Sequence, residues 1–403
     1  MSQRADDSLT AVAPPILAAP RALWSAVGAM TMCVALLIAS EFMPVSLLTP
    51  IARDLDATEG MAGQAISISG LFAVITSLLV ATVASRFDRR HVLAVLTAAM
   101  VASLALVAAA PNFTVFMAAR ALLGITIGGF WALSTATVMR LVPDESIPKA
   151  MGVLYLGNAV ATAVAAPIGS YVGGLIGWRG VFWALVPLAA ATLAWQWVSL
   201  PSMPAQAAIP LKRVLGLLQR RNVTFAMLGL MLTFGSAFAA FTYLRPFLET
   251  RAQATLPQLS LMLLGLGAAG FVGTAAATAL LRRHLYRLLW GLPLALGAVT
   301  VAMLAAGNAL WAVAAMMVAW GTLNSAIPVS WFNWLALAIK DEPEGGGGLM
   351  VAAIQLAIML GASLGGVLLD QFSVAATFVG ASALLLLASI TVGSGRRLRP
   401  QPA

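Results

Sequence analysis

The chain has 403 residues, of which 61% are hydrophobic and only 9% are charged, and its mean hydropathy is +0.94. This much apolar surface excludes a soluble domain, because one membrane-spanning helix needs about 20 apolar residues. We expect an all-α integral membrane protein that crosses the bilayer many times. The single cysteine, Cys33, excludes an internal disulfide and a cysteine metal cluster, so we expect no metal and no cofactor.

Apolar runs separated by charges or by glycine, proline and asparagine predict twelve transmembrane helices. They lie at approximately 22–48, 60–84, 91–110, 114–139, 148–175, 180–199, 222–246, 256–281, 287–307, 309–335, 348–369 and 373–393. Residues 1–21 lack the pattern of a signal peptide, and we expect a disordered cytoplasmic tail there. The longest connection, a cytoplasmic linker at 200–221, separates a six-helix bundle at 22–199 from a second one at 222–395, and a short cytoplasmic tail follows at 396–403.

The distribution of basic residues predicts the orientation of the chain. Eighteen of the 23 lysines and arginines fall in the even-numbered connections and the two tails. On the other side there are only four, Arg53, Arg179, Arg245 and Arg251. By the positive-inside rule, both termini are cytoplasmic. The basic residues behind the net charge of +9 therefore set the topology and contact lipid headgroups, and we expect no nucleic-acid partner.

Short strings recur between the two halves in nearly one register. Arg89-Arg90-His91 matches Arg282-Arg283-His284, Asp144-Glu145 matches Asp341-Glu342, and the turn Pro111-Asn112 matches Gly307-Asn308. Together these matches predict two parallel six-helix repeats, with a substrate site between them near the middle of the membrane.

Glu41 is the one acid well inside an apolar run. Residues 23–39 before it carry no charge, and Pro44 follows three residues later. A charge near the bilayer centre costs roughly 2.5–3.5 kcal/mol on insertion scales, so a carboxylate kept there generally serves a function. Because proline removes a helix hydrogen bond, it also bends the helix close to the acid. We expect Glu41 to carry a proton, and a structural role is the alternative.

Arg120 is the second unusual charge, inside the predicted fourth helix at a depth similar to that of Glu41. An acid and a base in one bundle interior can pair, and each then eases the desolvation of the other. The alternative is that Arg120 extends to the outer headgroups or binds helix ends.

Several neutral polar and aromatic residues also lie within the predicted spans. Amides, phenols and indoles suit a neutral, hydrogen-bonding, aromatic solute, although each one can equally serve packing between helices. The candidate substrate-binding residues are Trp131, Asn158, Tyr243, Asn324, Asn333 and Gln355.

Glycine motifs within the spans indicate packing rather than catalysis. Pairs spaced as Gly124 and Gly128 let helix backbones approach closely. The strings 265–270 and 361–365 fit a dinucleotide fingerprint and a nucleophile elbow, but both lie inside predicted spans without the strand that these motifs require. We therefore expect no enzymatic activity.

Several of these strings resemble the major facilitator superfamily, and within it the drug:proton antiporter group of bacterial efflux permeases. Glu41-Phe42-Met43-Pro44 resembles that group's first helix, residues 120–131 its fourth-helix motif, and Gly177-Trp178-Arg179 the start of its sixth helix. Residues 128–132, 139–143, 241–246 and 354–357 are similar to purine ribonucleoside efflux pumps of the same group.

The likeness is incomplete at two places. The second loop of the superfamily usually reads Asp-Arg-x-Gly-Arg-Arg, and here it contains Arg86, Asp88, Arg89 and Arg90 with Ser85 at the usual acid position. The usual charge contact of this gating loop must therefore be made by Asp88 or be lost. In the fifth helix, Ala165-Ala166-Pro167-Ile168-Gly169 keeps only part of the antiporter signature.

The resemblance implies a monomeric secondary transporter of the bacterial inner membrane, which exports purine ribonucleosides such as inosine, adenosine and guanosine against an inward flow of protons. It implies that Glu41 binds the proton and that Arg120 adjusts its charge state. A sugar or multidrug exporter of the same fold, a proton-coupled importer and a membrane sensor without transport are the alternatives.

Overall fold

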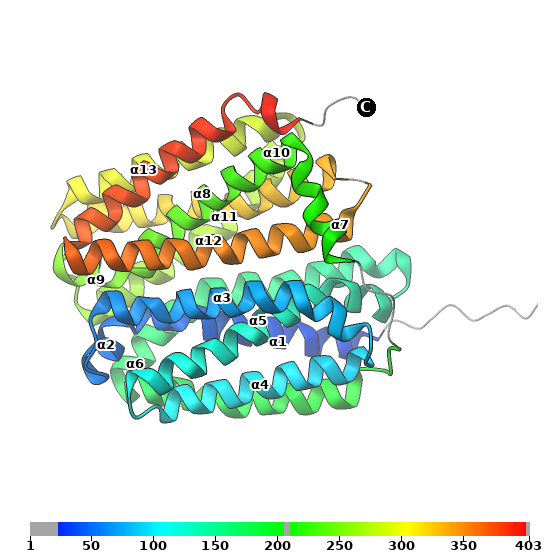
Figure 1. Ribbon diagram of the computed structural model, residues 1–403. Helices are drawn as coiled ribbons and strands as arrows, with labels where there is room; N and C mark the ends of the chain where they lie inside the picture. Colours follow the sequence, from blue (N-terminus) through cyan, green and yellow to red (C-terminus); the bar gives the residue numbers. More distant parts are fainter. Residues whose placement is uncertain (1–22, 205–209, 340, 400–403) are drawn as a thin grey trace, which may run out of the picture.

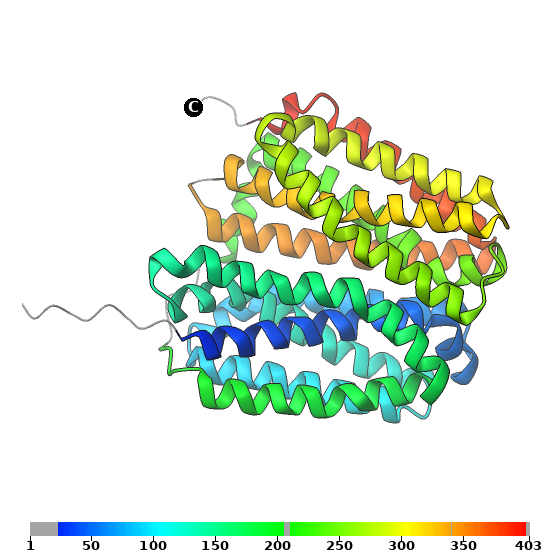
Figure 2. The same cartoon turned by 180° about the vertical axis from the view of Figure 1, so that it is seen from behind.

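The computed structural model describes residues 23–204, 210–339 and 341–399, which form a bundle of long α-helices (Figures 1 and 2). The tail expected at 1–21 lies outside the described residues. In the described part of the chain, eleven segments are long and apolar enough to cross a membrane. One of them contains α6, whose 53 residues would extend roughly 80 Å as one straight helix. Because α6 breaks at Gly177, where φ is 75°, it crosses twice, and the eleven segments make twelve crossings.

The predicted spans agree closely with the helices of the structure. The first half contains α1 (Trp24–Ser46), α2 (Leu48–Asp54), α3 (Glu59–Ala84), α4 (Arg89–Ala109), α5 (Phe113–Leu141), the 3-10 turn η1 (Asp144–Ser146) and α6 (Ile147–Ser199). The second contains α7 (Leu211–Gly216), η2 (Leu217–Gln219), α8 (Arg221–Thr242), α9 (Leu244–Thr250), α10 (Leu256–Ala306), α11 (Leu310–Ala338), α12 (Pro343–Gln371), α13 (Val374–Val392) and η3 (Arg396–Leu398). The predicted gaps after 175 and 281 fall at the breaks of α6 at Gly177 and of α10 at His284.

Each half has its own apolar core. One core is built almost entirely from residues of α1 to α6, and the other from residues of α8 to α13 with η2 and η3. In Figure 1 the two halves lie one above the other, with α3 of the first half beside α12 of the second. A second extensive contact between the halves joins α6 to α10, and α9 makes smaller contacts with α1 and α2.

The halves are joined mainly at one end of the bundle. We call the end that carries α2 and α9 the Thr49 end, and the opposite end the Arg90 end. Among the described residues, the hydrogen bonds between the two halves lie on the side of the Thr49 end. They join Thr49 to Glu249, Ser46 to Arg245, Gly60 and Thr58 to Asp370, Gly60 to Tyr243, Gln64 to Ser363, and Ser170 to Ser260. The structure is thus the conformation in which the Thr49 end is closed.

The first helix of each half breaks in the same way at this end. Leu47 separates α1 from α2 with φ −110° and ψ 10°, and Tyr243 separates α8 from α9 with φ −106° and ψ 21°. A proline follows three residues after each break, Pro50 in α2 and Pro246 in α9. These matched breaks are a further repeat between the halves, which the sequence strings did not reveal.

The connection at 200–221 is attached to both halves. Its beginning bonds to the first half, where the backbone N–H of Met203 donates to Asp88 at 3.1 Å. Its end contains α7 and η2, and it forms ion pairs with the second half: Arg213 with Glu342 at 3.0 Å and Arg220 with Asp341 at 2.5 Å. Arg220 holds the pKa of the Asp341 carboxyl below its usual value.

Candidate functional site

Glu41 lies in α1, nearly two turns before the break at Leu47, and only 4% of it is exposed. Glu41 is therefore buried in the structure, as expected from the sequence. No described residue donates a hydrogen bond to its carboxylate or forms an ion pair with it within 4.0 Å. An unpaired carboxylate in a buried position is costly when charged, so this group is well suited to bind a proton.

Arg120 of α5 is fully buried beside the same helix. Its Nη1 donates to the backbone carbonyl of Ser40 at 2.7 Å, and its Nε donates to the carbonyl of Ala65 in α3 at 3.2 Å. The Ser40 carbonyl is available because its normal helical partner is the N–H of residue 44, and Pro44 has none. Pro44 thus creates an acceptor that Arg120 uses.

This arrangement differs from the direct pairing expected between Glu41 and Arg120. The guanidinium donates to main-chain oxygens instead, and its buried Nη2 has no hydrogen-bond partner among the described residues. The physical reason is that a carbonyl released by proline needs a donor as much as a carboxylate does. Arg120 still acts on Glu41 through its charge, over a longer distance.

An aromatic cluster at the junction of the halves includes Phe42, the residue that follows Glu41 in α1. Phe42 of α1 contacts Phe238 and Phe241 of α8, with ring centroids 5.9 Å and 5.7 Å away. Phe241 stacks on Trp320 of α11 at 6.2 Å with an interplanar angle of 10°. All three phenylalanines are partly exposed, so their faces are not entirely used in packing. We call Phe42, Phe238, Phe241 and Trp320 the aromatic cluster.

The six predicted substrate-binding residues are more scattered than expected. No hydrogen bond or ring contact joins any two of them in the described part of the chain. In the first half, Trp131 stacks on Tyr155 at 6.2 Å, and Asn158 is half-buried in α6. In α11 of the second half, Asn324 is half-buried and Asn333 is exposed. Their role in binding remains a prediction.

Tyr243 and Gln355 have more specific environments. Tyr243 is fully buried at the break between α8 and α9, and its hydroxyl donates to the Ala362 carbonyl at 2.8 Å. In this conformation it therefore fills the contact between the halves rather than an open site. Gln355 is 6% exposed, and its Oε1 has no hydrogen-bond partner among the described residues. An unpartnered buried amide is suited to receive a ligand or a water molecule.

The gating loop is built around Asp88. Its Oδ1 caps α4 by accepting from the backbone N–H of Arg90 at 2.8 Å, and its Oδ2 accepts from Ser202 at 2.5 Å. Slight burial opposes the charged form, but these hydrogen bonds together hold the pKa of Asp88 below its usual value. Arg90 donates to the Trp197 carbonyl and lies over its ring, while Arg86 is exposed. The contacts of Asp88 stay within the first half and the linker, so they do not join the two bundles.

Comparison with known proteins places this architecture in a family. The sequence model of the Major Facilitator Superfamily matches residues 30–346 of this chain. The chain belongs to this superfamily. The predicted family and the fold of two six-helix repeats are thereby confirmed.

Two similar proteins carry different names. A protein of Pseudomonas aeruginosa named transcription regulatory protein OpdE is 47% identical over 94% of this chain and 95% of its own length. The purine ribonucleoside efflux pump NepI of Salmonella typhimurium is 38% identical over 94% of this chain and 95% of its own length.

Solved superfamily structures share the fold. A bacterial homologue of the human lysosomal transporter Spinster, inward-facing and unoccupied, has a TM-score of 0.75 at 15% identity, covering 94% of this chain and 99% of its own. The occupied inward-facing form has a TM-score of 0.79 at 16% identity, covering 94% and 98%. At this level of identity the likeness concerns the fold alone.

Proposed function

We propose that this protein exports purine ribonucleosides, such as inosine, adenosine and guanosine, across the bacterial inner membrane in exchange for protons. The observation that supports it most directly is the position of Glu41, a buried unpaired carboxylate whose chain neighbour Phe42 belongs to the aromatic cluster. Rings in proteins stack favourably at centroid distances of about 4.5–7 Å, and a purine base offers a face of the same kind. The name of the Salmonella relative agrees with this substrate class.

The proton site and the substrate site would be coupled through α1, which carries both Glu41 and Phe42. Protonation would neutralise Glu41 and remove the cost of its buried charge, and this would favour one facing of the transporter over the other. Arg120 would keep its partners through this change, because the carbonyls of Ser40 and Ala65 hold it in place whether or not Glu41 is charged. Glu41 can therefore load and release a proton without leaving the guanidinium unbonded.

The orientation follows from the positive-inside rule. The Arg90 end would face the cytoplasm together with both termini, and the closed Thr49 end would face outward. In this conformation a cytoplasmic nucleoside would enter from the Arg90 end. The protein would act as a monomer, with the lipid bilayer as its surroundings and protons and one small molecule as its ligands.

Inosine flux from proteoliposomes under an imposed pH gradient tests this proposal. We expect gradient-driven flux in the wild type and at least a tenfold loss of coupled flux in Glu41→Gln, which keeps the size of the side chain but cannot ionise. Asp144→Asn, which removes an exposed acid in η1, is the matched control and should transport normally. Undiminished coupling in Glu41→Gln would show that another group carries the proton.

The same assay separates the alternatives. Flux of sugars or lipophilic cations without inosine would indicate a different exporter, and accumulation with the proton gradient would indicate an importer. The Pseudomonas relative's name makes a regulatory membrane protein the second candidate. A sensor of that kind should bind a solute in detergent but move none across the vesicle membrane.

A further inference from the structure

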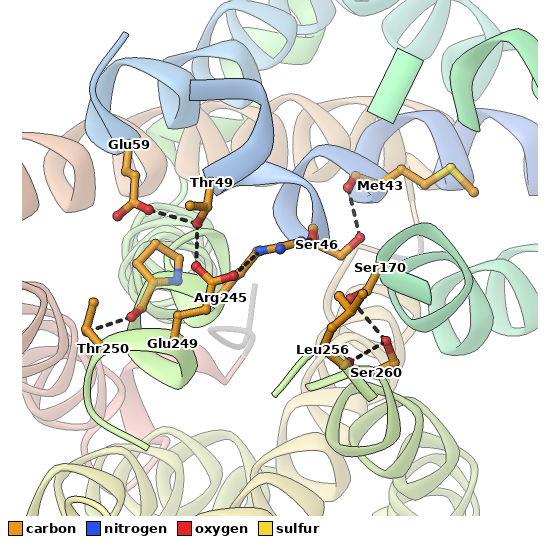
Figure 3. A network of polar contacts seen from close by, with 11 residues as sticks. Met43, Ser46, Thr49, Glu59, Ser170, Arg245, Glu249, Thr250, Leu256 and Ser260 are labelled. Atoms are coloured by element: carbon orange, nitrogen blue, oxygen red, sulfur yellow. Dashed lines mark hydrogen bonds and ion pairs between the residues drawn. The ribbon is translucent and has the colours of Figure 1, made fainter. Parts of the chain in front are cut away.

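At the Thr49 end, one hydroxyl group lies between two carboxylates. Figure 3 shows Thr49 of α2 between Glu59 of α3 and Glu249 of α9. Thr49 Oγ1 is 2.8 Å from Glu59 Oε1 and 2.7 Å from Glu249 Oε2. Glu59 and Thr49 belong to the first half and Glu249 to the second, so this set of three residues bridges the halves. Thr49 is 5% exposed, whereas Glu59 and Glu249 are half-buried.

These distances require one proton more than the ionised residues possess. A threonine hydroxyl has one hydrogen and can donate it to only one of the two carboxylates. At 2.7–2.8 Å the other carboxylate oxygen would then face a lone pair of Thr49, unless that carboxyl group carries a hydrogen of its own.

The neighbours of each acid indicate which one carries the additional proton. Arg245 donates from Nε to Glu249 Oε1 at 2.8 Å, which favours an ionised Glu249. Glu59 has no cation that donates to it: Arg53 and Arg245 act on it only through their charge, and Glu249 repels a negative charge there. Asp370, the acid of α12 on this side, already accepts from the Gly60 N–H at 3.0 Å and from Thr58 at 2.5 Å.

The resulting chain of hydrogen bonds crosses the interface twice. With the additional proton on Glu59, that carboxyl would donate to Thr49 and Thr49 would donate to ionised Glu249, which accepts from Arg245. Arg245 then returns to the first half, where its Nη1 donates to the Ser46 carbonyl. That carbonyl is free because its helical partner would be the N–H of residue 50, which is a proline.

We infer that closure of the Thr49 end binds a proton at Glu59, which makes this bridge a pH-sensitive latch between the halves. Without that proton, two carboxylates face each other across one hydroxyl and the bridge opens. The proton is taken up and released on the Thr49 side as this end closes and opens. It therefore senses the pH of that side and is distinct from the proton that Glu41 carries. The inference rests on the alternation of the proposed transport cycle, but it requires neither a nucleoside nor Glu41.

Pulsed EPR distances between two spin labels test the latch without any transport. The labels are placed at Pro111→Cys and Asn308→Cys, two exposed positions in the corresponding turns of the two halves at the Thr49 end. The native Cys33 is fully buried and should not react. In the wild type we expect the ratio of closed to open molecules to fall as the pH rises. The fall should reach up to about tenfold per pH unit in the range where Glu59 loses its proton.

Three variants identify the group responsible. Glu59→Gln keeps a neutral donor next to Thr49, so we expect it to stay closed between about pH 5 and about pH 9. Thr49→Val removes the relay and should open this end at every pH, whereas Thr49→Ser should restore the wild-type response. Thermal unfolding of each variant, followed by tryptophan fluorescence, checks that the fold is intact.

The outcome is independent of the proposed substrate. A wild type whose distances do not change with pH, or a Glu59→Gln variant that keeps the wild-type pH response, would overturn the latch. Glu41→Gln should leave the latch response unchanged, so loss of that response in Glu41→Gln would also contradict it. Absence of inosine flux alongside a normal latch response would instead refute only the proposed substrate.

Discussion

Three prolines of this protein release main-chain carbonyls that meet a group on another helix. A helical proline leaves the carbonyl four residues earlier without its N–H donor, and a buried carbonyl left unpaired is costly. The three cases are Ser40 with Arg120, Ser46 with Arg245, and Ala163 beside Gly267, after Pro44, Pro50 and Pro167 respectively. Two of the three contacts join the halves. Membrane helices satisfy most of their backbone internally, so a carbonyl released by proline is one place where the backbone can bind another helix.

A double-mutant cycle tests this mechanism at Arg120. Arg120→Lys replaces the guanidinium, which reaches the carbonyls of both Ser40 and Ala65, with a single amine. We expect this change to lower the free energy of unfolding by about 1.5–3 kcal/mol. Pro44→Ala returns an N–H to the Ser40 carbonyl, so Arg120→Lys should cost less in that background. Thermal unfolding in detergent measures the interaction free energy between Arg120→Lys and Pro44→Ala, which should be about 0.5–3 kcal/mol.

The matched control uses another proline inside a helix. Pro187 of α6 is distant in sequence from Arg120, whose guanidinium donates to Ser40 and Ala65 instead. Pro187→Ala combined with Arg120→Lys should give additive effects. Equal coupling in both cycles would mean that proline removal affects the helices in general rather than the Ser40 carbonyl.

Sequence analysis located the buried charges but not their partners. The apolar run around Glu41 was enough to predict its burial, because any charge there must lie in the membrane interior. Which acceptor Arg120 would choose depends on how α5 packs against α1 and α3, and this is a property of three helices together. The aromatic cluster was missed for a related reason. Phe42, Phe238 and Phe241 are ordinary apolar residues in their own helices, and only the contact between the halves gives them a common face.

At the scale of the helices, glycines set how closely the two halves approach. A methyl group at Gly267 of α10 would lie 2.2 Å from the Ala163 carbonyl of α6, and one at Gly361 would lie 2.0 Å from the Gly235 carbonyl. The first contact joins the halves, and the second joins α12 to α8 within one half. Such glycines therefore allow close packing both within one half and between the two halves, whose contact changes when the Thr49 end opens.

Gly267→Ala should weaken the closed state of the Thr49 end. Overpacking against a backbone carbonyl costs about 1–3 kcal/mol, and here separation of the halves relieves it. With the same pair of spin labels, we expect the open population to increase by roughly five- to a hundredfold. Gly291→Ala is the control in the same helix, because a methyl group there would meet nothing within 4 Å. Equal shifts in both variants would assign the effect to the helix rather than to the contact.

Helix boundaries were predictable wherever charge or glycine marks a turn. The breaks at Gly177 and His284 follow from Gly177-Trp178-Arg179 and from the basic residues before His284. The short helices α2 and α9 were not predicted, since Leu47 and Tyr243 are not helix-breaking residues. The available signal was the proline three residues after each break, and it becomes meaningful only when the two halves are compared.

For the whole molecule, the basic residues make a prediction about sidedness that chemistry can test. With single cysteines introduced at exposed positions, Asn308→Cys at the Thr49 end should react with an impermeant maleimide in intact spheroplasts. Lys212→Cys in α7 should react only after the membrane is opened. Native Cys33 is buried and gives the background level. The reverse pattern would mean that the protein has the opposite orientation in the membrane, with the Thr49 end in the cytoplasm. The latch would then sense cytoplasmic pH.

The matched breaks at Leu47 and Tyr243 also bear on how this protein arose. Their backbone angles differ by no more than 11°, yet the residues that follow them are Leu48-Thr49-Pro50 in one half and Leu244-Arg245-Pro246 in the other. An ancestral six-helix unit would thus have contributed the bend and its proline twice. The hydroxyl of Thr49 and the guanidinium of Arg245 diverged afterwards at equivalent positions. Duplication would have supplied the shape of the closed end, and divergence at positions such as Thr49 and Arg245 its chemistry.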